Sequence, residues 1–481
     1  MAKQRLEEIR KIRFEKVKKI KSLGLNPYPS KAPSKLEKIS SVVSTIDKKA
    51  VVAGRIWSVR EHGNCCFADV KDETGKIQLF LQKKKLGEKF KLVSLLDIGD
   101  FVWAKGKVIK TKAGEISLDV TDHGILTKSI RPIPSTWHGL KDIEERYRQR
   151  YIDLLLNDEL KDLLKKKTVF WHSMREFLYE KGFLEVETPI LENTVGGADA
   201  NPFVTHHDAL DIDLYLRISM GELWQKRLMV AGFEKTFEIG RQFRNEGISR
   251  EHLQDYTQME FYWAYANYED SMELVEEMYK YVAKKTFGKL KFKINDFEID
   301  LSKSWKRIDY TKTLLEQTGV DISKAKTDEI KAKLTKLKVS FEKKAARGKL
   351  IDTLWKSIRG NIAGPAFLVG HPVEVSPLAK RKDDDPKFTE RYQVIIAGSE
   401  MGNGYSELND PADQAERFKE QQKMRDKGDK DAQMHDHDFV KALEYGMPPT
   451  TGFGVSERLF SFLADKPIRE TVLFPLLKPK K

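Results

Sequence analysis

Residues 236–265 read TFEIGRQFRNEGISREHLQDYTQMEFYWAY, and their pattern predicts two strands joined by a charged loop. Phe237 and Ile239 alternate with polar residues, as in a strand with one buried face. A loop containing Gly247 follows, and apolar and aromatic residues resume from Tyr256 to Tyr265. The sequence therefore predicts a β-hairpin. The charged residues expected at its tip are Arg244, Glu246, Arg250 and His252.

The hairpin resembles motif 2 of the class II aminoacyl-tRNA synthetases. In that family the arginine of the F-R-N-E string binds the α-phosphate of ATP and the carboxylate of the amino acid, and the glutamate and a returning aromatic hold the adenine. The resemblance assigns these roles to Arg244, Glu246 and Tyr256, and adds His252 to the ATP site. An arginine suits the task, because a planar guanidinium meets charge on a carboxylate or phosphate through two hydrogen bonds. The alternative is a surface hairpin with solvated charges.

Length and composition indicate a protein of several domains. A chain of 481 residues is expected to form two or three domains, and 40% hydrophobic residues suffice for packed cores. The sequence has no run of about 18 apolar residues and no secretory signal, so no membrane association is expected. The adjacent Cys65 and Cys66 give neither a disulfide framework nor metal-ligand spacing, which favours a cytoplasmic location. The net charge of +13 favours a polyanionic partner such as nucleic acid, although it also fits a generic basic protein.

The N-terminal part is predicted to be a basic helix followed by a small β-barrel. Residues 1–48 would form the helix and a connector, and residues 49–127 the barrel. Five short strands separated by glycine-containing turns suit the OB-fold, a common binder of unstacked bases. The candidate strands are residues 51–59, 65–70, 77–82, 101–110 and 115–125.

Four residues of the predicted barrel are candidates for base recognition. An unstacked base needs an aromatic face for stacking and amide or acidic groups for hydrogen bonds to its edge. Phe67, Gln78 and Glu115 supply these groups, and Arg60 suits a phosphate or a base. Any β-barrel can contain such residues, but their sequence contexts resemble the anticodon-binding domains of lysyl-, aspartyl- and asparaginyl-tRNA synthetases. The resemblance implies an anticodon-binding face.

The C-terminal part resembles a class II catalytic domain. Residues 128–157, with Pro132 and Pro134, are predicted to be a linker, and residues 158–481 the catalytic domain. A long helix and a strand ending at Pro189 resemble motif 1, which lies at the dimer interface of the family. The resemblance implies an antiparallel sheet flanked by helices and a homodimer. The predicted fold class is therefore α+β, an OB-fold barrel joined to a class II synthetase domain.

The segment FVTHHDALDIDLYLRISMGEL at residues 203–223 resembles the lysyl-tRNA synthetases in particular. Glu222 matches the family's amino-acid-binding glutamate, although the preceding segment is one residue longer than the family's string. No Cys or acidic cluster accompanies His206 and His207, so a zinc site is not expected. The residues assigned to the lysine site are Gly197, Glu222, Glu260, Tyr262, Asn403, Tyr405 and Glu407.

Lysine recognition has an independent physical basis. The substrate carries two ammonium groups, and both need anions in a desolvated pocket. Glu222, Glu260 and Glu407 supply three carboxylates, whereas an aspartate pocket would need a cation for the side-chain carboxylate. Tyr262 can donate a hydrogen bond and Tyr405 can cover the aliphatic stem. The pattern therefore favours lysine over aspartate or asparagine, without deciding which carboxylate meets which ammonium.

Two further strings complete the predicted ATP site. Glu400 and Glu407 enclose the glycine-containing segment MGNGYS, which we expect to fold back so that both carboxylates hold Mg²⁺ against the ATP phosphates. Arg458 resembles the motif 3 arginine, which clamps the γ-phosphate, although its spacing from the preceding glycines is one residue shorter than in the family. Together with Arg244, Arg458 is expected to be catalytic.

The resemblance, taken over nearly the whole chain, implies a class II lysyl-tRNA synthetase. Such an enzyme is an AMP-forming ligase that activates L-lysine with ATP to lysyl-adenylate and transfers lysine to the 3′ end of tRNA(Lys) for translation. Two alternatives remain open. An aspartyl- or asparaginyl-tRNA synthetase shares the same domains. A non-catalytic RNA-binding paralogue would also fit the two spacing departures, near Gly221 and near Ser456.

Overall fold

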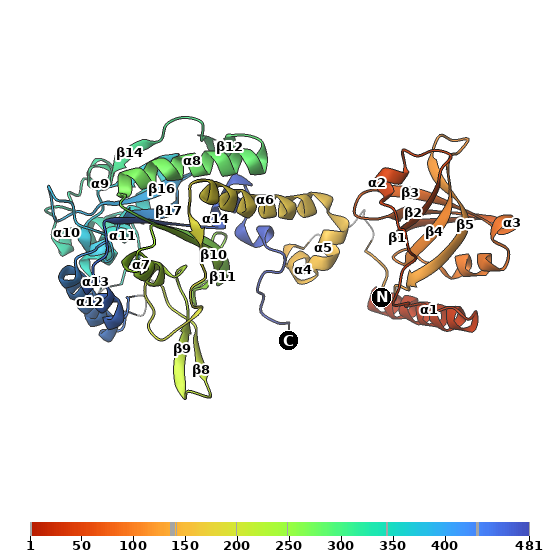
Figure 1. Cartoon of the computed structure of the whole chain (residues 1–481), viewed down its shortest axis with the longest axis horizontal. Coiled ribbons are helices and arrows are strands. Elements are labelled where there is room, and N and C mark those ends of the chain that lie inside the picture. The colour runs from red at the N-terminus through yellow and green to blue at the C-terminus, as the bar shows by residue number, and fades with distance from the viewer. Residues whose placement is uncertain are drawn as a thin grey trace. The chain divides into compact units, whose positions relative to one another are not determined.

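The computed structural model describes residues 2–134, 140, 142–198, 200–247, 249–342, 345–429 and 432–480. The chain forms two compact units, Met1–Leu156 and Asn157–Lys481, which are described separately below (Figure 1). Part of the predicted linker, residues 135–139 and 141, lies outside the described residues. Among the described residues, no helix has the length and apolar character needed to cross a membrane.

The first unit is built on a closed five-stranded barrel with strand order β1-β2-β3-β5-β4. Alternate residues of β2 and most of β4 are buried, as the period of two in the sequence predicts, whereas β3 buries three consecutive residues, Ile77, Gln78 and Leu79. The barrel strands are β1 (Lys49–His62), β2 (Cys65–Lys71), β3 (Lys76–Gln82), β4 (Phe101–Lys110) and β5 (Ile116–Thr127). The predicted strands are therefore present, with ends that differ by up to three residues. The short helical elements are α2 (Ile39–Val42), α3 (Lys83–Leu86), η1 (Gly87–Leu95), α4 (Ile143–Arg148) and α5 (Arg150–Leu156).

The N-terminal helix α1 (Ala2–Ser22) packs on the barrel unit through both apolar and charged side chains. Ile20 is part of the barrel core. The Arg13 guanidinium donates to the backbone oxygens of Ser129 and Ile98, each at 3.0 Å. The Lys16 ammonium donates to Asp97 at 2.8 Å. Some of the positive charge of the helix therefore fixes it to its own unit.

The second unit contains an eight-stranded sheet of order β14-β15-β16-β17-β18-β11-β10-β6. Its neighbouring strands are antiparallel, except for the β14–β15 and β10–β6 pairs. The sheet strands are β6 (Leu184–Glu185), β10 (Lys235–Phe243), β11 (Asp255–Ala264), β14 (Lys306–Asp309), β15 (Ala366–Val369), β16 (Arg391–Ile396), β17 (Ser399–Ser406) and β18 (Thr450–Ser456). The predicted hairpin is β10 and β11, which pair along their whole length.

Two long helices cover one face of this sheet. Helices α6 (Asp158–Glu180) and α8 (Tyr268–Phe287) pack against each other, and α8 also contacts β16, β17 and β18 (Figure 1). The sequence marks both ends of α8, because Asn267 and Asp270 form a capping box and Gly288 ends the helix with a positive φ of 71°. The largest hydrophobic core of the chain lies on this side and includes Phe261 and Phe453 of the sheet.

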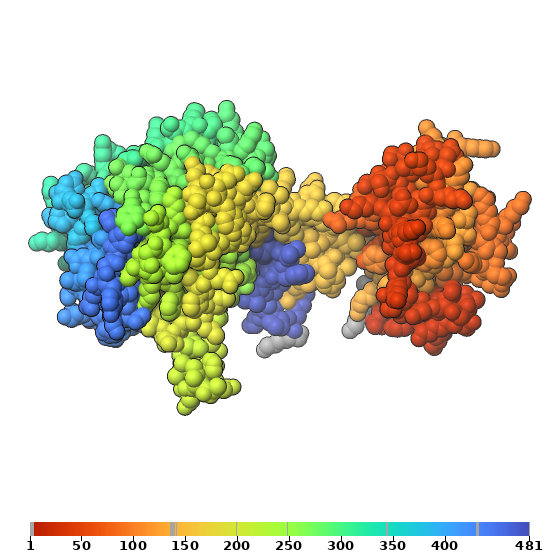
Figure 2. Space-filling model, viewed as in Figure 1, coloured from red at the N-terminus to blue at the C-terminus, as the bar shows by residue number. Residues whose placement is uncertain are grey.

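The other elements of the second unit surround the sheet. A small sheet of β7 (Leu191–Glu192), β9 (Ile212–Leu216) and β8 (Val204–His207) ends in a hairpin that projects from the unit (Figures 1 and 2). A two-stranded sheet contains β12 (Lys291–Ile294) and β13 (Phe297–Asp300). The helices are α7 (Glu222–Val230), α9 (Tyr310–Thr318), α10 (Thr327–Lys336), α11 (Arg347–Ile358), α12 (Pro411–Asp426), α13 (His437–Glu444) and α14 (Arg458–Leu463), with short turns η2 (Arg359–Asn361), η3 (Val373–Val375) and η4 (Ile468–Thr471).

Candidate active site

Three adjacent strands, β11, β18 and β17, carry most of the predicted lysine-binding residues on one face of the large sheet. Directly paired residues point to the same side of a sheet, as do residues two positions apart in one strand. One row contains Glu260, Gly454 and Asn403, and the next row contains Tyr262, Gly452 and Tyr405. The side chains of β11 and β17 therefore flank a central strip of glycine.

The glycine strip leaves room for the side chains around it. A Cβ atom at Gly452 would lie 2.6 Å from Cε1 of Tyr262, and a Cβ atom at Gly454 would lie 3.1 Å from Cγ of Glu260. The first distance is far shorter than a van der Waals contact between carbon atoms, and the second is slightly shorter than such a contact. The backbone of β18 thus forms a floor between the flanking side chains, and Gly452 is required there for space.

Three carboxylates meet above this floor, although they come from different elements. Glu222 is the first residue of α7, Glu260 lies in β11, and Glu407 follows the end of β17. Each is no more than 5% exposed.

Two other predicted residues adjoin the carboxylates. Gly197 has a φ of 89°, and a Cβ atom there would lie 2.9 Å from Cβ of Glu222. Asn403 accepts a hydrogen bond of 2.8 Å from Nε of Arg391.

Glu260 is fixed by three hydrogen bonds. Its Oε1 accepts from the backbone N–H of Met220 at 2.9 Å and from Nε2 of Gln258 at 2.6 Å. Its Oε2 accepts from the hydroxyl of Tyr262 at 3.0 Å. Burial and the neighbouring Glu222 nevertheless raise the pKa of Glu260 to about 7. The free-energy cost of a buried charge near another anion exceeds the stabilisation that the three hydrogen bonds give to the ionised form.

A lysine of the chain itself occupies part of the pocket. The Lys226 ammonium lies 2.7 Å from Oε1 of Glu222, forms an ion pair with Glu407, and lies 5.4 Å from the centre of the Tyr405 ring. Burial alone would lower the pKa of Lys226, but Glu222 and Glu407 outweigh it and raise that pKa. With Glu222, Glu260 and Glu407 ionised, the group carries a net charge of about −2.

Glu407 is the carboxylate with the poorest set of partners. It is 1% exposed, and Lys226 is the one side chain among the described residues with which it forms an ion pair. Burial raises the pKa of Glu407, and the charge of Glu222 adds to the effect. A buried carboxylate with unfilled acceptor sites is costly, so a cationic ligand at this position would gain free energy.

Arg244 lies at the end of β10, beside the carboxylate pocket. Its Nε donates to the backbone oxygen of Ile218 at 3.2 Å, and its guanidinium lies 5.9 Å from the centre of the Tyr256 ring. Ile218 is four residues before Glu222, so Arg244 contacts the segment that leads into the acidic pocket. Glu246 follows in the exposed loop, where its backbone oxygen accepts from Gln254 at 3.3 Å.

Arg458, the first residue of α14, reaches toward the same loop. It donates to the backbone oxygen of Glu400 and lies 3.8 Å from Glu251. Nδ1 of His252 hydrogen-bonds the Ser249 hydroxyl at 2.7 Å. Partial burial lowers the pKa of His252, and the nearby charge of Arg458 lowers it further. The region around Arg244, His252 and Arg458 is therefore cationic and suits a polyphosphate.

The prediction that Glu400 and Glu407 hold Mg²⁺ against the ATP phosphates stays a prediction, although the expected fold-back between them is absent. The segment between them does not fold back: it is β17, an extended strand paired with β16 on one side and β18 on the other. Seven steps along a strand place the two residues roughly 20 Å apart. Glu400 contacts Trp355, Gln393 and Arg359, whereas Glu407 contacts Lys226. Among the described residues no group of three or more His, Cys, Asp or Glu side chains has the geometry of a metal site.

The barrel unit brings the predicted base-binding residues to one outer face. Arg60 of β1 is paired with Phe67 of β2, and the Phe67 ring stacks on Phe80 with centroids 4.8 Å apart. Oε1 of Gln78 accepts from the Ser117 hydroxyl at 3.0 Å, and the exposed Glu115 lies two residues before Ser117. Gln78 itself is buried, whereas Glu115 is exposed and Phe67 is partly exposed.

Comparison with known proteins assigns both units to one family. The family described as class II tRNA synthetases (D, K and N) matches residues 142–478, and the OB-fold nucleic acid binding domain matches residues 50–126. The lysine–tRNA ligase of Thermotoga maritima is 46% identical over 489 residues, which cover 99% of this chain and 97% of that protein. The lysine–tRNA ligase of Thermoanaerobacter pseudethanolicus is 45% identical with the same coverage, and that of Clostridium tetani is 47% identical over 90% of this chain and 88% of its own length.

The chain belongs to the class II lysine–tRNA ligases. The predicted family and α+β fold class are thereby confirmed. In this ligase the two spacing departures are accommodated locally. Gly221 has a φ of 65° where a Cβ atom would lie 2.7 Å from Cβ of Thr188, and Glu222 then begins α7 inside the pocket. The buried carboxylate of Glu457 accepts from the backbone N–H of Thr257 at 3.0 Å and fixes the register of Arg458.

Sequence reasoning missed two charged residues that form ion pairs with predicted site residues. Lys226 lies four residues after Glu222, and this spacing places both on one face of a helix, so a signal was present. Arg359 follows α11 and forms an ion pair of 3.2 Å with Glu400, which is 41 residues further along the chain. The sequence carries no local signal for this second contact, because it depends on how α11 docks on the sheet.

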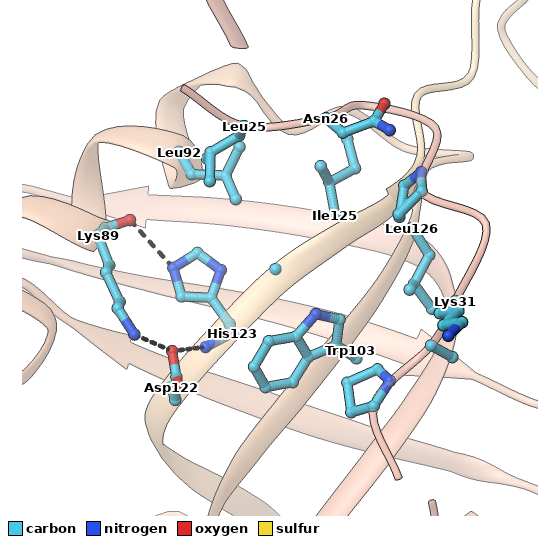
Figure 3. A pocket seen from close by; sticks show the side chains of 14 residues that line it. Leu25, Asn26, Lys31, Lys89, Leu92, Trp103, Asp122, His123, Ile125 and Leu126 are labelled. Atoms are coloured by element: carbon cyan, nitrogen blue, oxygen red, sulfur yellow. Dashed lines mark hydrogen bonds and ion pairs between the residues drawn. The ribbon is translucent and has the colours of Figure 1, made fainter. Parts of the chain in front are cut away.

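The barrel unit contains a cavity of about 440 Å³ whose lining includes none of the predicted anticodon residues. Residues 25–33 cover one side of it, and Trp103 and His123 lie in the strands on the other side (Figure 3). Nε2 of His123 hydrogen-bonds the backbone oxygen of Lys89 at 3.1 Å. Burial lowers the pKa of His123, which keeps the imidazole neutral. The lining consists of groups that anchor the connector to the barrel.

Proposed function

We propose that this lysine–tRNA ligase binds lysine in the pocket of Glu222, Glu260 and Glu407 and ATP between the motif 2 hairpin and Arg458. The observation that carries the proposal is the charge of the pocket. When all three are ionised, the buried carboxylates and the internal ammonium carry a net charge of about −2, which matches the two ammonium groups of lysine. Tyr262 and Tyr405 would line the aliphatic stem.

The first step forms lysyl-adenylate. The lysine carboxylate attacks the α-phosphorus of ATP, an oxygen–phosphorus bond forms, and the bond to the bridging oxygen breaks to release pyrophosphate. Arg244, beside the pocket, would bind the carboxylate and the α-phosphate together, and Arg458 would bind the γ-phosphate. Glu246, His252 and Tyr256 would contact the nucleotide. Mg²⁺ would enter with ATP, and Glu400 and Glu407 are the carboxylates proposed to hold it. Positioning and charge stabilisation would supply the rate enhancement.

The second step transfers lysine to tRNA. A ribose hydroxyl at the 3′ end of tRNA(Lys) attacks the carbonyl carbon of the adenylate, an ester forms, and AMP leaves. No nucleophile of the protein is needed for this exchange. The outer face of the barrel, with Arg60, Phe67, Gln78 and Glu115, would hold the anticodon.

Lysine-dependent exchange between ATP and pyrophosphate tests the proposal directly. With all twenty amino acids assayed in parallel, we expect exchange with lysine and not with aspartate or asparagine. Exchange with another amino acid would keep the class but overturn the carboxylate argument. A folded chain that binds tRNA and supports no exchange would be a non-catalytic RNA-binding protein.

Phe67→Ala is expected to lower kcat/KM for tRNA about 10-fold to 100-fold, because stacking of one base on an aromatic ring contributes about 1–3 kcal/mol. Exchange without tRNA should be unchanged, since the barrel holds none of the adenylate-forming residues. Tyr28→Ala serves as a control, because Tyr28 is an exposed aromatic of the same unit that donates to the backbone oxygen of Lys128. Unchanged tRNA charging in Phe67→Ala would refute stacking on this ring.

The pKa of Glu260 predicts the pH dependence of lysine use. Burial raises this pKa to about 7, so the carboxyl gains a proton and loses its charge as the pH falls below that value. We expect kcat/KM for lysine to fall about 10-fold between pH 8 and pH 6, because the neutral form attracts an ammonium group less. The kcat/KM for ATP should depend less strongly on pH than the kcat/KM for lysine. Parallel profiles for the two substrates would show that the ionisation lies elsewhere.

We also propose that the ligase is a cytoplasmic homodimer. Leu473, Phe474 and Leu476 are apolar and between 53% and 70% exposed. They border a cavity of about 380 Å³ that Trp171 of α6 also lines. An exposed apolar cluster of this kind suits an interface between copies. Sedimentation of the full chain would report the mass of a dimer, and a monomer at micromolar concentration would contradict the proposal.

A further inference from the structure

The side-chain ammonium of Lys226 lies between two buried carboxylates of the proposed lysine pocket. Its Nζ is 2.7 Å from Oε1 of Glu222 and forms a second ion pair with Oε2 of Glu407. The ammonium also lies 5.4 Å from the centre of the Tyr405 ring and 5.9 Å from the centre of the Phe439 ring. Because Lys226 is 1% exposed, its charge is compensated by these protein groups and not by bulk solvent.

Helix α7 holds Lys226 in this position through the residues on either side of it. The side chain of Gln225 donates to a backbone oxygen of the loop before α7 at 2.9 Å. Nη2 of Arg227 donates to Oδ2 of Asp436, the N-cap residue of α13, at 3.0 Å. Glu222 lies one helical turn before Lys226, so the two side chains share one face of α7. The ammonium is therefore a fixed part of the pocket.

The pocket around Lys226 contains three carboxylates and two phenols. They belong to Glu222 of the same helix, Glu260 and Tyr262 of β11, Tyr405 of β17 and Glu407. Burial raises the pKa of Glu407 and the charges of Glu222 and Glu260 add to the effect, whereas the charge of Lys226 opposes it. Without this ammonium, three like charges would share one buried site, which favours the uptake of a proton by one of the carboxylates. Lys226 therefore acts against protonation of the empty pocket.

We propose that Lys226 is a positioning residue for lysine recognition, whose ammonium holds Glu222 and Glu407 in place as anions before the substrate enters. With Glu260 also ionised, the empty pocket presents a net charge of about −2 to the two ammonium groups of lysine. A substrate ammonium then meets a carboxylate without first displacing a proton from it. The proposal rests on the proposed function, because it assumes that lysine binds in this pocket.

Calorimetric titration with L-lysine at several pH values tests this role. In Lys226→Met the three carboxylates should share a proton near neutral pH, and lysine binding should expel it. We expect about one further proton to be released per lysine bound, so the dissociation constant should fall about 10-fold more per pH unit than in the wild type. The wild type should show a weaker dependence of its own, since burial raises the pKa of Glu260 to about 7. Buffers of different ionisation enthalpy report the proton count directly.

The pH dependence separates this role from a purely structural one. If Lys226 only supported the packing of α7, its loss would weaken lysine binding equally at every pH. Equal pH dependence in Lys226→Met and the wild type would therefore overturn the proposal. Lys226→Arg retains the cation and should keep the wild-type pH dependence. Lys441→Met is the matched control and should also keep it, because Lys441 is an exposed lysine of α13 in the same unit. A wild-type protein that binds no lysine would overturn the proposed function, and this proposal with it.

A double variant provides a second test if Lys226→Met is unstable. Removing the cation alone leaves a buried anion without compensation, which destabilises a fold. Lys226→Met combined with Glu407→Gln removes one charge of each sign and leaves two carboxylates in the pocket. The unfolding temperature should therefore rise from that of Lys226→Met toward the wild-type value. An unfolding temperature of the double variant no higher than that of Lys226→Met would overturn the proposal.

Discussion

Replacing Arg244 with alanine is expected to lower lysine-dependent ATP–pyrophosphate exchange by about 10³-fold, the upper range for removal of one preorganised donor from a charged transition state. The guanidinium lies beside the acidic pocket and within reach of the tip of the motif 2 hairpin. It would contact both the attacking carboxylate and the α-phosphate, so its loss acts where the new bond forms. Exchange of labelled pyrophosphate into ATP measures the effect.

The affinity for tRNA is the internal control of this experiment. The dissociation constant for tRNA should remain within about two-fold of the wild-type value in Arg244→Ala, because the proposed anticodon face lies in the other unit. Arg241→Ala is a suitable control, since Arg241 is an exposed arginine of the same strand paired with Asp255. Equal losses of exchange and tRNA binding would indicate that the variant is misfolded. Full exchange activity would remove Arg244 from the site.

Replacing Glu407 with glutamine is expected to raise the KM for lysine about 10²-fold, because breaking a buried ion pair commonly costs about 3 kcal/mol. Glu407 is buried, has Lys226 as its one ion-pair partner among the described residues, and is a carboxylate proposed to receive a substrate ammonium. The KM for ATP should change by less than about three-fold, since Arg458, which is proposed to bind the γ-phosphate, donates to Glu400 near the other end of β17. Steady-state exchange with each substrate varied in turn separates the two constants.

The internal Lys226 requires a control for this variant. Losing Glu407 leaves Lys226 with Glu222 as its ion-pair partner, so part of any loss could come from a disturbed pocket. Thermal unfolding of Glu407→Gln should therefore be measured beside Glu444→Gln, which changes an exposed carboxylate at the end of α13. A KM for ATP that rises in parallel with the KM for lysine would argue against a direct contact with the substrate.

Local patterns in the sequence were sufficient for much of the fold. The alternation of apolar residues located the barrel strands, and Asn267 and Gly288 mark the ends of α8 by known capping chemistry. The carboxylates of the pocket could be named because two ammonium groups demand anions. Their positions then follow from the register of β11, β18 and β17, which the hydrophobic pattern alone does not specify.

The expected fold-back between Glu400 and Glu407 is absent because neighbouring strands hold that segment on both sides. The two glycines between Glu400 and Glu407 predicted a fold-back, since glycine adopts the conformations that turns require. In the structure that segment is held extended by strands on both sides, and its glycines leave space instead: a Cβ atom at Gly404 would lie 2.6 Å from the Tyr392 ring. Arg359 was missed for a related reason, because its partner is distant in sequence and no periodicity connects them.

The strip formed by Gly452 and Gly454 would set limits on any redesign of the proposed amino acid pocket. The depth of the pocket is determined by main-chain atoms at this strip, so no substitution there can deepen it, and even one methyl group at position 452 would collide with Tyr262. A library that seeks a longer or bulkier substrate should therefore vary the walls, Tyr262 and Tyr405, and leave the floor untouched. The same geometry makes position 452 a place where a small mutation would inactivate the protein without unfolding it.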